Sequence, residues 1–285
     1  MGDVDYGNKG GGLDPSRSSI ALFPHDCLDV AENYKDGTFQ LLLTSTPYPG
    51  QAGFELTGFD YINWWWDRLR AWLPKLNQKT GVVVQNIQFK RTELGWYDMR
   101  TFMDLMTVYR ATNLKMIDIY PWDKLNSPPS GNHNRHDRNE WEFCFALALS
   151  PGYKFYPYRK PYAEKTVGKA KPGNKMRQTD VRGSHAGGHS ELHPDGARQS
   201  NMLRISSSGD QNRPRVKGGV FPRELAERFI LQFSDPWDEV VDPFMGSGTT
   251  IKMASKHRRH VVGCETDPEA FKIAKKWLLG KNYHE

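Results

Sequence analysis

Two short stretches of the sequence carry residue types suited to chemistry. In the first, three leucines at 41–43 and Thr44 are followed by Ser45, Thr46, Pro47 and Tyr48. An apolar strand that ends in hydroxyls, a proline and an aromatic ring is typical of the lip of an active site. The same pattern fits a buried strand that ends in a proline turn, so residues 41–50 alone leave both interpretations open.

The second stretch is a glycine turn after a predicted strand, and it reads Asp242-Pro243-Phe244-Met245-Gly246-Ser247-Gly248-Thr249-Thr250. Glycines let the backbone approach a ligand at the carboxyl edge of a sheet, where α/β folds bind nucleotide-like cofactors. No lysine follows the second glycine, so this turn is not a phosphate loop.

An acidic residue stands at the end of the next predicted strand, at Glu265. A carboxylate in that position accepts both hydrogens of a ribose diol. A nicotinamide cofactor satisfies this requirement, but Asp242 before the turn disfavours a pyrophosphate. A cationic adenosine derivative without phosphates fits the two carboxylates better.

The elements that must position these stretches alternate along the chain. Predicted strands cover residues 20–23, 39–44, 81–86, 116–120, 141–149, 239–242 and 260–264, and predicted helices cover 59–76, 97–112, 221–230 and a closing segment that ends near 279. This alternation predicts parallel strands with helices on both faces, a three-layer α/β fold. In the first long helix we expect a buried apolar stripe formed by Phe59, Ile62, Trp66, Leu69, Trp72, Leu73 and Leu76.

A basic segment interrupts this alternation. Residues 154–217 contain 14 Lys and Arg residues against five Asp and Glu residues, with many Gly, Pro, Ser and His residues and no periodic apolar face. Such a segment is a disordered linker or a surface that becomes ordered on a polyanion, and the second is favoured because ordered sequence flanks it. His185, His189 and His193 are four residues apart, but the glycines among them argue against a helix and a metal site. We therefore divide the chain into a disordered tail at 1–19, a catalytic domain at 20–153 and 218–285, and this basic insertion.

The bulk composition excludes several classes of protein. A net charge of +6 and a pI near 9.1 make polyanions plausible partners. No apolar run approaches the length of a membrane span and residues 1–19 hold no secretory signal, so we expect an intracellular, cytoplasmic protein. Cys27, Cys144 and Cys264 are far apart, which predicts neither a disulfide framework nor a zinc site.

Together these motifs resemble the β subgroup of the DNA amino-methyltransferases that use S-adenosylmethionine. The glycine turn is similar to their cofactor motif I, Glu265 to their motif II acid and Phe221-Pro222-x-x-Leu225 to their motif X, while Ser45-Thr46-Pro47-Tyr48 resembles their catalytic motif IV. Asp26 is similar to an acid that the family places near adenine, although His25 replaces the usual glycine. The resemblance implies a Rossmann-like sheet with an inserted target recognition region. It also implies a set of cofactor-binding residues, namely Asp26, Phe221, Asp242, Phe244, Gly246, Ser247, Gly248, Thr249 and Glu265.

The first residue of motif IV separates two substrates in this family. Adenine-N6 members have Asp or Asn there, whereas cytosine-N4 members have Ser, so Ser45 points to the N4 atom of a flipped cytosine. The resemblance implies that the Ser45 hydroxyl and the Pro47 carbonyl accept the amino hydrogens, and that Tyr48 stacks on the extruded base. Thr46 departs from the proline of the family pattern. Carbon-5 methylation is not indicated, because none of the three cysteines follows a proline.

By this resemblance the basic insertion would recognise double-stranded DNA, with Arg198, Arg204, Arg213 and Arg215 as its contact residues. Adenine-N6 methylation, a cytosine in RNA and an inactive DNA-binding protein with the same fold stay open as alternatives. A cognate restriction endonuclease that acts separately is a further possible partner. The sequence is compatible with a monomer or a homodimer.

Overall fold

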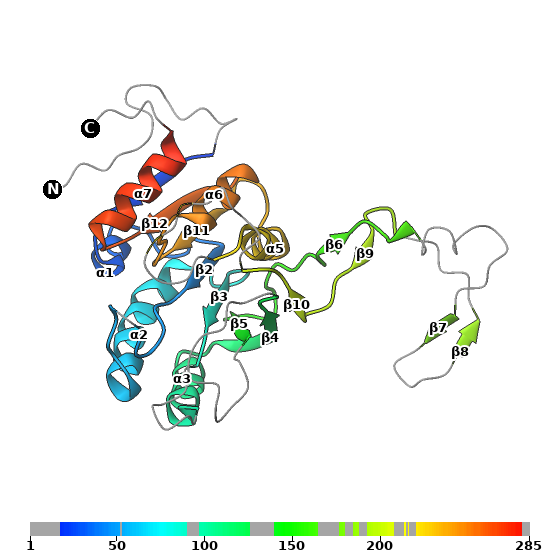
Figure 1. Cartoon of the computed structure of the whole chain (residues 1–285), viewed down its shortest axis with the longest axis horizontal. Helices are drawn as coiled ribbons and strands as arrows, with labels where there is room; N and C mark the ends of the chain where they lie inside the picture. Colours follow the sequence, from blue (N-terminus) through cyan, green and yellow to red (C-terminus); the bar gives the residue numbers. More distant parts are fainter. Residues whose placement is uncertain are drawn as a thin grey trace. The chain divides into compact units, whose positions relative to one another are not determined.

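A computed structural model describes residues 18–51, 53–89, 97–125, 140–164, 193–207, 214, 216 and 221–280, together with the backbone of 177–179 and 185–187. The chain divides into two compact units (Figure 1). The larger unit contains the chain up to Phe155 and from Asn201 onward, and the smaller unit is Tyr156–Ser200.

An eight-stranded sheet forms the centre of the larger unit, in the order β1-β12-β11-β2-β3-β5-β4-β10. Its strands are β1 (Ile20–Phe23), β2 (Leu41–Ser45), β3 (Val82–Ile87), β4 (Lys115–Asp123), β5 (Trp141–Ala148), β10 (Leu203–Arg204), β11 (Glu239–Asp242) and β12 (His260–Cys264). Strands β1, β12, β11, β2 and β3 are parallel to one another. Runs such as Val82–Ile87, in which every residue is buried, are typical of parallel strands covered on both faces.

Helices cover both faces of this sheet, so the predicted three-layer α/β fold is confirmed. One apolar core joins the sheet to α1 (Cys27–Ala31), α2 (Gly58–Trp72) and α3 (Met99–Ala111). A second core joins it to α5 (Arg223–Phe233), α6 (Thr249–Lys256) and α7 (Pro268–Leu279). Successive side chains of β2 alternate between them, since Leu42 lies in the first core and Leu41 and Leu43 in the second.

Two details of the sheet differ from the sequence prediction. Strand β5 is antiparallel to both β3 and β4, whereas alternation with helices predicted parallel pairing. No helix separates β4 from β5 in the described residues, so nothing there requires a parallel crossover. In addition, β10 pairs with β4, which places residues that we assigned to the basic insertion in the main sheet.

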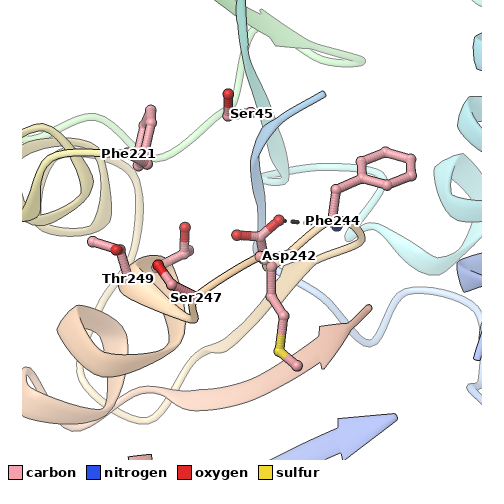
Figure 2. A pocket seen from close by; sticks show the side chains of 9 residues that line it. Ser45, Phe221, Asp242, Phe244, Ser247 and Thr249 are labelled. Carbon is pink, nitrogen blue, oxygen red and sulfur yellow. Dashed lines mark hydrogen bonds between the residues drawn. The ribbon is translucent and has the colours of Figure 1, made fainter. Parts of the chain in front are cut away.

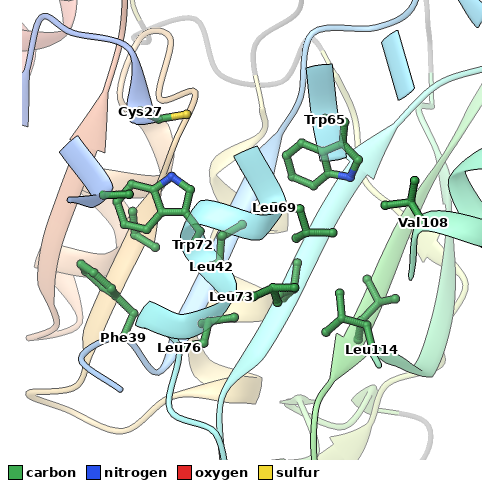
Figure 3. Packing of buried hydrophobic residues seen from close by; sticks show 14 of the residues in the cluster. Cys27, Phe39, Leu42, Trp65, Leu69, Trp72, Leu73, Leu76, Val108 and Leu114 are labelled. Carbon is green, nitrogen blue, oxygen red and sulfur yellow. The ribbon is translucent and has the colours of Figure 1, made fainter. Parts of the chain in front are cut away.

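The buried stripe of α2 also needs correction. Figure 3 shows Trp65, Leu69 and Trp72 in the core together with Leu73 from the following 3-10 turn, η1 (Leu73–Lys75). Phe59, predicted to be buried, is 69% exposed, and Trp66 is only partly buried. Three consecutive tryptophans at 64–66 make the helical phase ambiguous in the sequence, and packing selects Trp65.

The smaller unit has short strands. Within it, β6 (Arg159–Lys160) pairs with β9 (Ala197–Arg198), and β7 (Arg177–Thr179) pairs with β8 (His185–Gly187). Gly196, at φ +99°, lies against the Lys160 carbonyl so closely that a Cβ would fall 2.2 Å from that oxygen. The pairing of β6 with β9 therefore requires glycine at this position.

Candidate active site

The two stretches that carry chemistry meet at the carboxyl edge of the sheet. Strands β2 and β11 are parallel neighbours, with Leu42 opposite Val241, so the residues after them emerge side by side. A pocket at this edge is lined by residues of both stretches and by one residue that precedes α5 (Figure 2): Ser45, Phe221, Asp242, Phe244, Met245, Gly246, Ser247, Thr249 and Thr250. Seven of the residues singled out in the sequence are brought together here.

Asp242 is a buried carboxylate at one wall of this pocket. Its Oδ1 atom accepts hydrogen bonds from Thr44 Oγ1 at 2.7 Å and from the Phe244 amide at 3.1 Å. Burial raises the pKa of Asp242 to about 6, although the hydrogen bonds from Thr44, Thr250 and Phe244 oppose that shift. The site thus holds a negative charge that lacks a positive partner among the described residues, which favours a cationic ligand.

The glycine turn is shaped by two left-handed residues. Gly246 has φ +51° and Gly248 has φ +83°, a region that side chains other than glycine rarely adopt. A Cβ on Gly248 would also lie 2.8 Å from Leu278 Cδ1 of α7. Both glycines are therefore required by the backbone, and the Gly248 position packs the turn closely against the closing helix.

Glu265 fastens this turn to the end of β12. Its Oε2 atom accepts the Gly246 amide at 3.0 Å, and its Oε1 atom accepts the Asp267 amide at 2.8 Å. Burial raises the pKa of this carboxyl. Each carboxylate oxygen has a second lone pair, so these contacts leave acceptor capacity for a ligand hydroxyl.

Thr249 is the first residue of α6 and lines the pocket (Figure 2). Its hydroxyl is buried and has no hydrogen-bond partner among the residues that the structure describes. A buried hydroxyl without a partner is costly, and the first turn of a helix also offers free amide donors. The position is therefore suited to an anionic or carbonyl group of a ligand.

The Phe244 ring points away from Ser247 and Thr249 (Figure 2). It packs against Trp64 of α2, with ring centroids 5.1 Å apart. The Arg68 guanidinium lies 4.5 Å from the centroid of the same Trp64 ring and forms an ion pair with Asp26. Asp26 is also the N-cap of α1, since its carboxylate accepts the Leu28 amide. Asp26 does not line the pocket, and its described contacts are structural.

The motif Ser45–Tyr48, which begins at the last residue of β2, divides its side chains between pocket and core. Ser45 lines the pocket, and its hydroxyl donates to Asn86 Oδ1 at 3.0 Å. Thr46 is only 2% exposed and its hydroxyl bonds to the Tyr61 hydroxyl at 3.2 Å. Gln85 donates to the same Thr46 oxygen, so the Thr46 side chain is anchored in the core and does not line the pocket.

Tyr48 completes this group through its hydroxyl, which donates to Glu142 Oε2 at 2.6 Å. Asn86 and Glu142 were not singled out in the sequence. The sequence carried a signal for Asn86, because it is a polar residue near the carboxyl end of the strand beside β2. Glu142 was not, because it arrives on the antiparallel strand β5.

The three cysteines are all buried. Burial raises the pKa of Cys27 to about 12, and burial likewise raises the pKa values of Cys144 and Cys264 well above their ordinary value. Thiols in this state stay protonated and are poor nucleophiles. The site therefore contains no activated cysteine.

The predicted DNA-contact residues fall in three places. Arg198 is exposed on β9 in the smaller unit, and Arg204 is exposed on β10 in the larger unit. Arg213 and Arg215 lie outside the described residues. Among the residues that the structure describes, no group of three His, Cys, Asp or Glu side chains is placed to hold a metal ion. In the same part of the chain, no helix has the length and apolar character needed to cross a bilayer.

Comparison with curated proteins finds similar sequences among DNA-modifying enzymes. The orphan methyltransferase M.BamHII of Bacillus amyloliquefaciens is 28% identical over 271 residues, which cover 89% of this chain and 93% of that protein. The type II methyltransferase M1.MboII of Moraxella bovis is 23% identical over 257 residues, which cover 86% of this chain and 90% of that protein.

Solved structures share the fold. The PvuII DNA methyltransferase, described as cytosine-N4-specific, matches with a TM-score of 0.72 at 18% identity, over 94% of this chain and 89% of that one. The complex of M1.HpyAVI with S-adenosylmethionine matches with a TM-score of 0.57 at 20% identity, over 90% of this chain and 98% of that one. The model of the N6/N4 DNA methylase family matches residues 39–276, which include both the Ser45 motif and the glycine turn. The chain therefore belongs to the N6/N4 family of DNA methylases.

Proposed function

We propose that this protein transfers a methyl group from S-adenosylmethionine to the exocyclic N4 atom of a cytosine extruded from double-stranded DNA. The observation that carries the proposal is the position of Ser45, whose side chain lines the same pocket as Asp242 and the glycine turn. A group that engages the target base and a group that engages a cationic cofactor are thereby side by side. The PvuII enzyme, which shares the fold, is described as cytosine-N4-specific, and this supports the choice of base.

The residues of the pocket fit S-adenosylmethionine. The Asp242 carboxylate matches the positive charges of the cofactor, and the Thr249 hydroxyl with the first turn of α6 matches its carboxylate. Glu265 has acceptor capacity for the ribose hydroxyls beside the turn. Phe221 supplies an apolar wall. Related structures are described as complexes with the same cofactor.

The protein's task is to make a poor nucleophile reactive. The amino nitrogen of cytosine is weak because its lone pair is delocalised into the ring. In the proposed mechanism the Ser45 hydroxyl and the Pro47 carbonyl accept its two hydrogens, so that charge on the nitrogen is stabilised as it attacks. The cofactor supplies an electrophilic methyl group. The amino nitrogen would gain this methyl group as the cofactor's sulfur is displaced with its electron pair, and one amino proton would pass to water.

The basic insertion is the proposed DNA-recognition segment. Its 14 Lys and Arg residues against five Asp and Glu residues give it a larger positive excess than the net charge of +6 of the whole chain. Exposed arginines such as Arg198 and Arg204 are suited to phosphate or base contacts. The target base must leave the duplex, because its amino group is inaccessible to a cofactor inside the stack. Tyr48 is the proposed stacking partner of the extruded base.

The decisive experiment is nucleoside mass spectrometry of duplex DNA treated with the protein and S-adenosylmethionine. The proposal predicts N4-methylcytosine. N6-methyladenine without N4-methylcytosine would establish the adenine alternative, and preferential labelling of structured RNA over duplex DNA would overturn the DNA substrate.

Cofactor titration separates the enzyme from an inactive DNA-binding protein. The intact site around Asp242, Gly246 and Glu265 predicts micromolar binding, and undetectable binding favours the inactive protein. Replacement Ser45→Ala should lower turnover and leave the cofactor dissociation constant unchanged. Thr107→Ala, which removes an exposed hydroxyl from α3, serves as the matched control and should change neither.

A further inference from the structure

A chain of polar side chains leads from the pocket into the sheet. Ser45, the last residue of β2, lies opposite Asn86 of β3, and its hydroxyl donates to Asn86 Oδ1. The Tyr48 hydroxyl lies 3.0 Å from the same Asn86 oxygen and 2.6 Å from Glu142 Oε2. Glu142 is 3% exposed and forms an ion pair through its other oxygen with Lys124, the residue that follows β4. The residues beyond Ser45 have no part in the mechanism described so far, apart from the stacking of the Tyr48 ring.

The carboxylate of Glu142 determines which group donates in its hydrogen bond with Tyr48. An ionised carboxylate paired with Lys124 only accepts hydrogen bonds, so Tyr48 must be the donor between the two. The bond is short and charge-assisted, which makes Glu142 a better acceptor of the phenol proton than the neutral Asn86 oxygen. Burial, and then the charge of Glu142, raises the pKa of Tyr48, so the phenol keeps the proton that it donates.

The Asn86 amide is oriented by its other end. Its Nδ2 atom donates to the Phe143 carbonyl at 3.2 Å and contacts Cys144 Sγ at 3.6 Å. Because the nitrogen is committed to these acceptors, Oδ1 must face Ser45 and Tyr48. Two acceptors therefore flank the Ser45 hydroxyl on the inner side: Asn86 Oδ1 and the Tyr48 phenol oxygen, which also interacts with Ser45.

We infer that Asn86 and Glu142 are positioning residues that set the Ser45 hydroxyl as a hydrogen-bond acceptor toward the target amino group. Their arrangement draws the Ser45 proton inward, so the lone pairs of its oxygen face the pocket. A hydroxyl that rotated freely would present its own hydrogen to the amino hydrogens for part of the time, which would weaken transition-state stabilisation. This inference rests on the proposed function of Ser45 in methyl transfer.

The replacement Glu142→Gln tests the direction of the hydrogen bonds that lead from Glu142 through Tyr48 to Ser45. A glutamine amide has the same shape but can donate, which allows Tyr48 to turn its proton toward Ser45 or Asn86. We expect single-turnover methyl transfer to fall 10- to 100-fold, as for other residues that orient a reactive group, with an unchanged dissociation constant for S-adenosylmethionine. Tyr48→Phe keeps the ring for stacking and removes only the hydroxyl, and we expect it to lower the rate by a similar factor. Glu32→Gln, on the exposed end of α1, is the matched control and should leave the rate unchanged.

A double-mutant cycle distinguishes positioning from general damage. If Glu142 acts through Ser45, adding Glu142→Gln to Ser45→Ala should change the residual rate by less than about twofold. An equal loss in both backgrounds, or a Tyr48→Phe variant with the parent rate, would overturn the inference. Thermal unfolding of each variant identifies any loss that is due to misfolding, and Tyr48→Phe then replaces Glu142→Gln in the cycle.

The same assay keeps the two proposals apart. An unmodified protein that forms N4-methylcytosine while the cycle is additive overturns only the positioning role. A protein that forms N6-methyladenine overturns the choice of base, and the cycle still reports on Ser45. The absence of any methyl transfer by the unmodified protein would overturn both.

Discussion

Thr44 Oγ1 donates a 2.7 Å hydrogen bond to Asp242 Oδ1, and this contact joins the strand that leads to Ser45 with the strand that leads to the glycine turn. Thr44 is fully buried and Asp242 is 3% exposed. The bond therefore fixes the Ser45 motif and the glycine turn relative to one another, although they are far apart in the sequence.

The first prediction removes this contact. Thr44→Val keeps the shape of the side chain and leaves Asp242 with one donor fewer in a buried site. We expect the free energy of unfolding to fall by about 1–3 kcal/mol and cofactor binding to weaken. Denaturant unfolding and cofactor titration measure the two effects. Thr44→Ser, which restores the hydroxyl, should recover most of the binding, and a Thr44→Val variant with the parent affinity would contradict the role assigned to the bond.

The second prediction concerns the pH dependence of Asp242. Its pKa is raised from 3.8 to about 6 by burial, so between these values the folded protein binds a proton more tightly than the unfolded chain. The stability that this group contributes is present below about pH 4 and is lost as the pH rises through 6. Affinity for a cationic cofactor should change in the opposite direction and increase as Asp242 ionises.

Asp242→Asn tests both statements. The variant should lose the step in cofactor affinity near pH 6, and its free protein at pH 8 should be more stable than the parent, by up to about 3 kcal/mol. Thermal unfolding from pH 5 to pH 8 and cofactor titration over the same range provide the measurements. If the cofactor affinity of the variant still changes near pH 6, a group other than Asp242 is responsible for that change.

The third prediction concerns Gly248. Alanine there must adopt φ +83° and would place its Cβ 2.8 Å from Leu278, so we expect a loss of more than about 1 kcal/mol together with weaker cofactor binding. Gly37→Ala is the matched control, because Gly37 also has positive φ but has open space around the added carbon. Equal losses of stability in the two variants would show that backbone strain alone is responsible.

The fourth prediction separates two aromatic residues of α2. Trp65→Ala should lower the free energy of unfolding by about 3–5 kcal/mol, because Trp65 is 1% exposed. Phe59→Ala should change it by less than about 0.5 kcal/mol, because Phe59 is 69% exposed. Chemical denaturation of both variants checks the correction to the predicted helical stripe, which a large loss for Phe59→Ala would reverse.

The sequence predicted the architecture well because its signals are local. The leucines at 41–43 and the glycine turn each indicate the structure of their own segment, and alternation of strands and helices implied the three layers. The rule that ligands bind at the carboxyl edge of such sheets predicted the position of the glycine turn. That residues 41–50 act together with this turn was implied only by the resemblance to the DNA amino-methyltransferases.

The rest depends on tertiary contacts that no local pattern encodes. The antiparallel direction of β5 brings Glu142 to Tyr48, and sequence periodicity does not report strand direction. The ion pair of Asp26 with Arg68 joins α1 to α2, and no local pattern predicts it. The tryptophans at 64–66 satisfy more than one helical phase, so only packing decides which of them is buried.

The central claim is that Ser45 presents an acceptor to a cytosine amino group beside a bound cofactor. Its most direct test is quantification of methylated nucleosides in duplex DNA treated with the parent protein and with Ser45→Ala under single-turnover conditions. The account predicts N4-methylcytosine from the parent and a sharply reduced rate from the variant, with equal cofactor affinity. N6-methyladenine as the sole product, or an undiminished rate for Ser45→Ala, would contradict it.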